Sequence, residues 1–262
     1  MQKNNVLLFV LLIAMTTMLV GCVTSPAENK SEPDSIKKEI YEWRIYTLKE
    51  NSGQTLDDFF QNTLIPAYNR QGISVGAFSL FKAEEPGRRY LLFVYPDMDS
   101  YLKTRKEIWK DQTFATAAQP YFELTAPNPI YEIYETYLCE AFDKIPKMRM
   151  PDQDRTLFEF RNYKSPNDEA GQRKVKMFNA GEIDIFDKTG VNSVCYGEVL
   201  AGTRMPSLIY LTWYKDETTR NEAWEKFGKH PEWQTMRALP EYANTTNNNI
   251  SVLLSPMPYS QF

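Results

Sequence analysis

Two short stretches of the sequence, YEWRIY (residues 41–46) and FEFRNY (residues 158–163), are nearly the same six residues written twice. Each alternates large apolar side chains with a Glu-x-Arg-x-Tyr series. A β-strand points successive side chains to opposite faces, so each stretch predicts a strand with a carboxylate, a guanidinium and a phenol on one side. The repeated strand marks the start of two similar units.

The similarity continues beyond the two strands. IPAYNRQGISVGAF (residues 65–78) matches IDIFDKTGVNSVCY (residues 183–196) with Gly72 over Gly190, and further along Asp97 falls over Asp216. Repeated units of this length favour tandem domains over a solenoid. We expect a first repeat over residues 39–145 and a second over residues 155–256.

The order of elements within each unit predicts the fold class. Alternating and helical patterns follow one another as strand, helix, strand, strand, helix, strand, which is the ferredoxin-like β-α-β-β-α-β motif. Both helices would cover one face of each sheet, so the other face needs a partner. We therefore predict an α+β fold in which two tandem ferredoxin-like sheets face each other as an α/β barrel.

The same residues resemble the NIPSNAP family. The resemblance is carried by YEWRIY, by the two aligned stretches above and by FGKHPEWQTM (residues 227–236), and it spans roughly Ile40 to Leu254. This resemblance implies the fold of the dimeric α/β-barrel superfamily, but it does not imply an established reaction. Relatives with one repeat must dimerise to build the barrel, whereas two repeats can build it as a monomer; a homodimer stays open.

The N-terminal sequence predicts where the protein is located in the cell. Lys3 precedes an apolar run, and the run ends in Leu19-Val20-Gly21-Cys22, which resembles a bacterial lipobox. We expect residues 1–21 to be a lipoprotein signal peptide, Cys22 to carry the lipid, and residues 22–38 to be a disordered tether. The protein would then be held at the membrane of the bacterial cell envelope, on its periplasmic or surface side. The alternative is an ordinary signal peptide followed by a coincidental cysteine.

The charged face of the repeated strand is the candidate site. We expect the apolar set, Tyr41 and Trp43 in the first copy, to pack under the helices, which would turn the polar set toward the space between the sheets. Buried Glu and Arg must pair with each other or with a ligand, and arginines favour an anionic one. The alternatives are a structural polar network, a solvated sheet edge and a pocket. The candidate pocket-lining residues are Glu42, Arg44, Tyr46, Glu159, Arg161 and Tyr163.

Other chemistry finds little support in the sequence. The net charge of −4 does not suggest a nucleic-acid partner. No motif with metal-ligand spacing occurs, so we expect no metal and no cofactor. The one histidine, His230, precedes Pro231 and fits the start of a short helix better than a haem ligand. Cys139 and Cys195 would either form a disulfide or, more simply, be two buried thiols.

Three functions remain open at this stage. The first is a binding or accessory module that holds a small apolar or anionic molecule between the sheets. The second is a cofactor-light oxygenase or isomerase that uses arginine and tyrosine from the repeated strands. The third is a structural protein-interaction domain, for which the space between the sheets would be filled with side chains. Stacking of a carbohydrate on the many aromatic residues is a further, weaker alternative.

Overall fold

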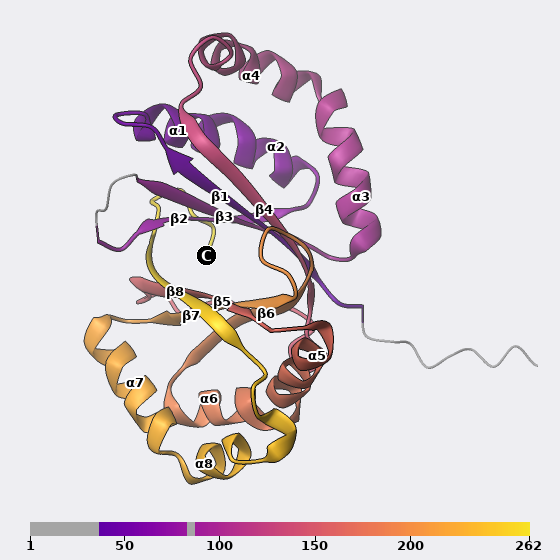
Figure 1. Cartoon of the computed structure of the whole chain (residues 1–262). Coiled ribbons are helices and arrows are strands. Elements are labelled where there is room, and N and C mark those ends of the chain that lie inside the picture. Colours follow the sequence, from indigo (N-terminus) through magenta and orange to yellow (C-terminus); the bar gives the residue numbers. More distant parts are fainter. Residues whose placement is uncertain (1–36, 83–86) are drawn as a thin grey trace, which may run out of the picture. The chain divides into compact units, whose positions relative to one another are not determined.

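The structure is a computed structural model that describes residues 37–82 and 87–262 (Figure 1). The predicted signal peptide, Cys22 and nearly all of the predicted tether lie outside the described residues. Among the described residues, no helix has the length and apolar character needed to cross a membrane.

The described elements follow the predicted order twice. The first half contains strands β1 (Ile40–Leu48), β2 (Ser74–Leu80), β3 (Arg88–Tyr95) and β4 (Tyr131–Ala141), with helices α1 (Gly53–Phe59), η1 (Phe60–Leu64), α2 (Ile65–Arg70), α3 (Met98–Glu107), η2 (Ile108–Lys110) and α4 (Gln112–Thr125). The second half contains strands β5 (Leu157–Lys164), β6 (Asn192–Ala201), β7 (Ser207–Tyr214) and β8 (Asn247–Pro256), with helices α5 (Asp168–Met177), η3 (Phe178–Glu182), α6 (Ile183–Thr189), α7 (Glu217–Lys229), α8 (Pro231–Arg237) and η4 (Pro240–Tyr242).

The strands form one closed barrel. The strand order is β4-β1-β3-β2 in the first half and β8-β5-β7-β6 in the second, and all pairs are antiparallel. The halves join where β2 pairs with β8 and where β4 pairs with β6. The predicted pair of ferredoxin-like sheets that face each other is therefore confirmed, and a single chain closes the barrel.

The helices cover the barrel from outside. Figure 1 shows α1 to α4 on one side of the barrel and α5 to α8 on the opposite side. The repeat is visible in the ends of the helices: Asp97 caps α3 by accepting from Ser100 N at 2.8 Å, and Asp216 caps α7 by accepting from Thr219 N at 2.7 Å. Gly72 and Gly190 follow α2 and α6 with φ of 77° and 84°, a conformation that glycine adopts without strain.

The barrel interior is packed with apolar side chains. Trp43 of β1 meets Phe160 of β5 edge-on, with ring centroids 4.9 Å apart, and Phe78 meets Phe158 at the same distance. Phe262 is also buried there, at 1% exposure, and its ring lies so close to Gly76 that a Cβ on that residue would come within 2.3 Å of it. The space between the sheets is therefore largely occupied by the chain itself.

This packing corrects the predicted orientation of the repeated strands. The apolar set, with Trp43 and Phe160, points into the barrel, and the Glu-x-Arg-x-Tyr sets point outward under the helices. The prediction that Glu42, Arg44, Glu159 and Arg161 meet at the barrel interior is wrong. The physical reason is that both faces of these strands are buried, and only the helix-covered face offers polar partners for the charges.

The two cysteines follow the simpler prediction. Cys139 and Cys195 are both buried and unpaired, and burial raises the pKa of each thiol. They pack in the barrel interior as small apolar side chains.

Candidate ligand-binding site

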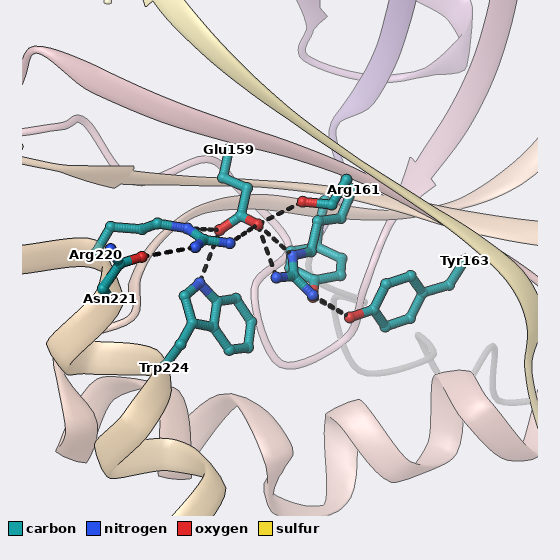
Figure 2. Close-up of polar contacts among 8 residues, drawn as sticks. Glu159, Arg161, Tyr163, Arg220, Asn221 and Trp224 are labelled. Carbon is teal, nitrogen blue, oxygen red and sulfur yellow. Dashed lines mark hydrogen bonds and ion pairs between the residues drawn. The ribbon is translucent and has the colours of Figure 1, made fainter. Parts of the chain in front are cut away.

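In the second half, the repeated strand supplies a closed polar network (Figure 2). Glu159 is fully buried and accepts from Arg161 Nε at 2.8 Å, from Arg220 Nη2 at 2.6 Å and from Trp224 Nε1 at 2.7 Å. Ser251 of β8 also donates to it, at 2.6 Å. The carboxylate thus has partners on every side, as a buried charge requires.

The guanidinium of Arg161 is also surrounded by protein groups, with 16% of the side chain exposed. The ring of Trp224 covers it at 3.9 Å, and its Nη1 donates to the Tyr163 hydroxyl at 2.8 Å. That hydroxyl in turn accepts from Tyr210 at 2.8 Å. In the second half, therefore, both ends of the guanidinium are bonded to protein groups.

The charges in this network hold each other ionised. Burial by itself raises the pKa of Glu159, but Arg220, Arg161 and Ser251 outweigh it, so the pKa lies below its ordinary value. Burial likewise disfavours the charged form of Arg161, and the neighbouring oxygens reverse this, so its pKa is raised.

In the first half, the same motif makes fewer bonds. Arg44 donates to Glu42 from Nε at 2.7 Å and from Nη2 at 3.1 Å, and Nη2 also donates to the Tyr68 hydroxyl at 2.6 Å. Tyr95 donates to Glu42 at 2.7 Å. The ring of Phe93 lies under the guanidinium at 4.1 Å. Arg44 is thus held by Glu42 of its own strand and by Tyr68 of α2, and these bonds use only Nε and Nη2.

Substitutions between α3 and α7 contribute to the difference. Trp224 stands about two turns after the cap of α7, and the residue at the same place after the cap of α3 is Arg105. Arg220 is likewise replaced by Tyr101, which bonds Arg105 at 2.9 Å rather than Glu42. The indole that covers Arg161 therefore has no counterpart over Arg44.

A cavity of about 460 Å³ lies above Arg44, between β1, β4 and the helices of the first half. Its floor includes Glu42, Arg44 and Tyr46. Its walls are mostly aromatic, with Phe59 and Tyr121 stacked at 3.8 Å and Trp109 at the rim, 68% exposed. The volume and the apolar walls with a few polar groups are typical of small-molecule sites.

The second half has a cavity at the corresponding place, of about 430 Å³, whose lining includes Tyr163, Lys174, Glu182, Trp224 and Trp233. Tyr163 and Trp224 are the counterparts of Tyr46 and Arg105 in the first cavity, but Arg161, unlike Arg44, does not line it. Lys174 and Glu182 form a buried ion pair at 2.7 Å, and burial raises the pKa of Glu182 despite this partner. Another recess, of about 570 Å³, has Phe81 and Gly87 among its walls.

The predicted candidates thus separate into two groups. Glu42, Arg44 and Tyr46 line the cavity of the first half, and Tyr163 lines that of the second. Glu159 and Arg161 are hydrogen-bonded within the closed network of the second half. The sequence interpretation missed five residues of these networks: Tyr68, Tyr95, Arg220, Trp224 and Ser251. A signal for Trp224 was present, because Asp97 and Asp216 align as helix caps. Eight residues after these caps, the first repeat has Arg105 and the second has Trp224.

His230 lies at the start of a short helix. His230 occupies the N-cap position of α8, and Pro231 begins that helix, as predicted; the imidazole itself makes no capping bond, unlike the side chain of Asp111 at the start of α4. Across residues 37–82 and 87–262, no cluster of three or more His, Cys, Asp or Glu side chains has the arrangement of a metal site.

Comparison with known proteins gives a family match over the second half of the chain. The NIPSNAP family model matches residues 158–261. No curated protein sequence matches the chain. An uncharacterized NIPSNAP domain protein from Burkholderia xenovorans is 20% identical, with a TM-score of 0.36, over 40% of this chain and 99% of that one.

Two solved structures resemble the whole barrel. A candidate monooxygenase from Fusobacterium nucleatum is 10% identical with a TM-score of 0.56, over 84% of this chain and 93% of that one. A second candidate monooxygenase, from Lactobacillus acidophilus, is 11% identical with a TM-score of 0.52, over 84% and 94% of the two chains. At these identities the likeness supports the fold alone.

Proposed function

We propose, from the NIPSNAP family match over the second half and the repetition of its fold in the first, that the chain is a binding module for a small, largely apolar molecule held in the cavity above Arg44. The second half would serve as a scaffold that closes the barrel. The observation that carries the proposal is the difference between the repeats: Trp224 covers Arg161, whereas Arg44 borders an aromatic cavity.

The location differs from the one expected from the sequence. The packed barrel interior, with Trp43, Phe160 and Phe262, leaves the space between the sheets to side chains. The cavity of the first half instead lies between the sheet and its helices, where Phe59, Tyr121 and Trp109 provide apolar contact area. Burial of an aromatic ligand against such rings is favourable at about 25 cal/mol per Å² of apolar area.

A titration of the purified full chain with 2-naphthamide, a neutral aromatic probe, tests the proposal. We expect saturable binding that the Trp109→Ala variant weakens several-fold, because the indole forms part of the rim. Trp233→Ala is the matched control, since Trp233 borders the cavity of the second half. An absence of saturable binding, or an equal loss in both variants, would contradict the proposal.

The lipid anchor belongs to the same proposal. Cys22 follows a lipobox-like sequence, so the module would be tethered to the cell envelope through this residue and the segment that follows it. Cells that express the chain should incorporate labelled fatty acid into it, and the Cys22→Ala variant should lose the label. Equal labelling of the variant would refute the anchor.

Glu42, the carboxylate that borders the cavity, is held by Arg44 and Tyr95, which fits a structural role better than that of a general base. The monooxygenase descriptions apply to the two neighbouring structures, whose likeness to this chain is one of fold.

A further inference from the structure

The cavity of the first half contains a pair of polar groups that the second half joins together. In the second half, Arg161 Nη1 donates to the Tyr163 hydroxyl at 2.8 Å. The corresponding atoms of the first half are Arg44 Nη1 and the Tyr46 hydroxyl. Within the described part of the chain, neither of these two groups has a hydrogen-bond partner.

The reason for the difference lies on the neighbouring helices. Tyr68 of α2 and Phe186 of α6 hold equivalent positions, because each accepts the same backbone bond after the helix, from Ile73 N and from Val191 N, both at 3.1 Å. The Tyr68 hydroxyl binds Arg44 Nη2 at 2.6 Å. Phe186 has no hydroxyl, so the second half holds its guanidinium through Tyr163 instead.

Both groups are held firmly although they lack partners. The Arg44 side chain is 11% exposed and is fixed by Glu42, Tyr68 and the ring of Phe93. Tyr46 is 7% exposed, and its ring stacks on Tyr134 with centroids 4.7 Å apart. Neither is among the polar atoms sealed from solvent without a partner, and both residues line the cavity. They are therefore donors that water or a ligand must satisfy.

We propose, building on the binding function above, that Arg44 Nη1 and the Tyr46 hydroxyl form an oxyanion subsite, and that the ligand is an aromatic or otherwise apolar carboxylate. One carboxylate oxygen accepts from Nη1 and from the phenol, in the position that the Tyr163 hydroxyl fills in the second half. The apolar body of the ligand lies against Phe59, Tyr121 and Trp109.

The charges around the subsite fit an anion. Glu42 is neutralised by Arg44, with which it forms two hydrogen bonds, and Tyr95 donates to it as well. Arg105 is exposed, lines the same cavity and adds a second positive charge near the opening. The guanidinium is suited to carboxylates because its planar N–H groups match their geometry.

A pair of probes with the same shape tests this inference on the full chain: 2-naphthoate carries a carboxylate, and 2-naphthamide is its neutral analogue. We expect the wild-type chain to bind 2-naphthoate about tenfold more tightly, because a hydrogen bond to a charged group is worth more than one to a neutral group. The Tyr46→Phe variant keeps the stacked ring and loses the hydroxyl, so it should reduce this preference several-fold.

Tyr163→Phe is the matched control, because it makes the same change in the closed half and should leave the preference unaltered. Thermal unfolding of each variant verifies that it is folded. Equal affinity of the wild-type chain for both probes would overturn the subsite while leaving the binding function intact, and so would an undiminished preference in Tyr46→Phe. Binding of neither probe would overturn the binding function itself.

Discussion

The two halves of the barrel use the same strand motif for opposite purposes. Glu159 and Arg161 sit in a network completed by Arg220 and Trp224 of α7. Glu42 and Arg44 sit beside a cavity, because α3 places Arg105 where α7 has Trp224. A duplicated unit can thus keep its fold in both copies while exchanges on the helices decide whether the strand arginine borders the cavity or is covered by an indole.

The largest expected effect is the loss of the central carboxylate of the closed half. Glu159→Gln removes a fully buried carboxylate and leaves the partly buried Arg161 and Arg220 without their counter-charge, and we expect it to lower the free energy of unfolding by about 3–5 kcal/mol. Chemical denaturation measures the change. Glu42→Gln is the matched variant in the open half, where water in the cavity can reach Arg44, and its cost should be smaller, about 1–2 kcal/mol. Equal costs would contradict the contrast between the halves.

The buried ion pair of the second half gives the next test. Leu56 and Leu64, both buried, occupy the corresponding positions of the first half. Lys174→Leu alone should destabilise the protein by about 3 kcal/mol, because it leaves Glu182 buried and unpaired. The double variant with Glu182→Leu copies the first half and should unfold within about 1 kcal/mol of wild type. Urea denaturation of both variants decides the matter; a double variant as unstable as the single one would be the contrary result.

An indole placed over Arg44 should weaken ligand binding in the first half without unfolding the protein. Arg105→Trp supplies the indole that α7 provides in the second half, and we expect the affinity for 2-naphthoate to fall by about tenfold. Because Arg105 is exposed, the stability should change by only about 0.5 kcal/mol. Calorimetric titration together with thermal unfolding measures both quantities. Unchanged affinity would indicate that ligands bind elsewhere.

The smallest expected effect is a dependence on pH. The pKa of Glu159 is lowered in the folded protein, so its ionised form contributes stability above the unfolded pKa of about 4.3. That contribution is lost as the pH falls through the folded pKa. The wild-type chain should therefore lose more stability than Glu159→Gln between pH 6 and 3. Denaturation curves at several pH values check this; parallel losses in both proteins would contradict it.

The repeat made most of the fold predictable. Strand alternation in YEWRIY and FEFRNY, the aligned glycines and the aligned caps were enough to predict two ferredoxin-like sheets in one barrel. The repeat did not predict which face of β1 and β5 points into the barrel and which lies under the helices. An alternating pattern separates two faces, but both faces of a helix-covered barrel are buried, so the pattern does not tell which one is inside.

The candidate site was predictable only in part. Glu42, Arg44 and Tyr46 follow from the repeated strand, because their spacing places them on one face. Tyr68 and Trp224 come from helices far away in the sequence, and their contacts depend on how those helices pack. The exchange of Trp224 for Arg105 can be found from the aligned caps. Its consequence, a guanidinium that either lies under an indole or borders a cavity, requires the three-dimensional arrangement.

The most direct test of the account is a crystal structure of the chain with 2-naphthoate. We predict that the naphthyl ring occupies the cavity of the first half and that a carboxylate oxygen lies within hydrogen-bond distance of Arg44 Nη1 and the Tyr46 hydroxyl. The network of Glu159, Arg161 and Trp224 should be unchanged. Density for the ligand in the barrel interior or beside Lys174, with the first cavity empty, would contradict the central claim.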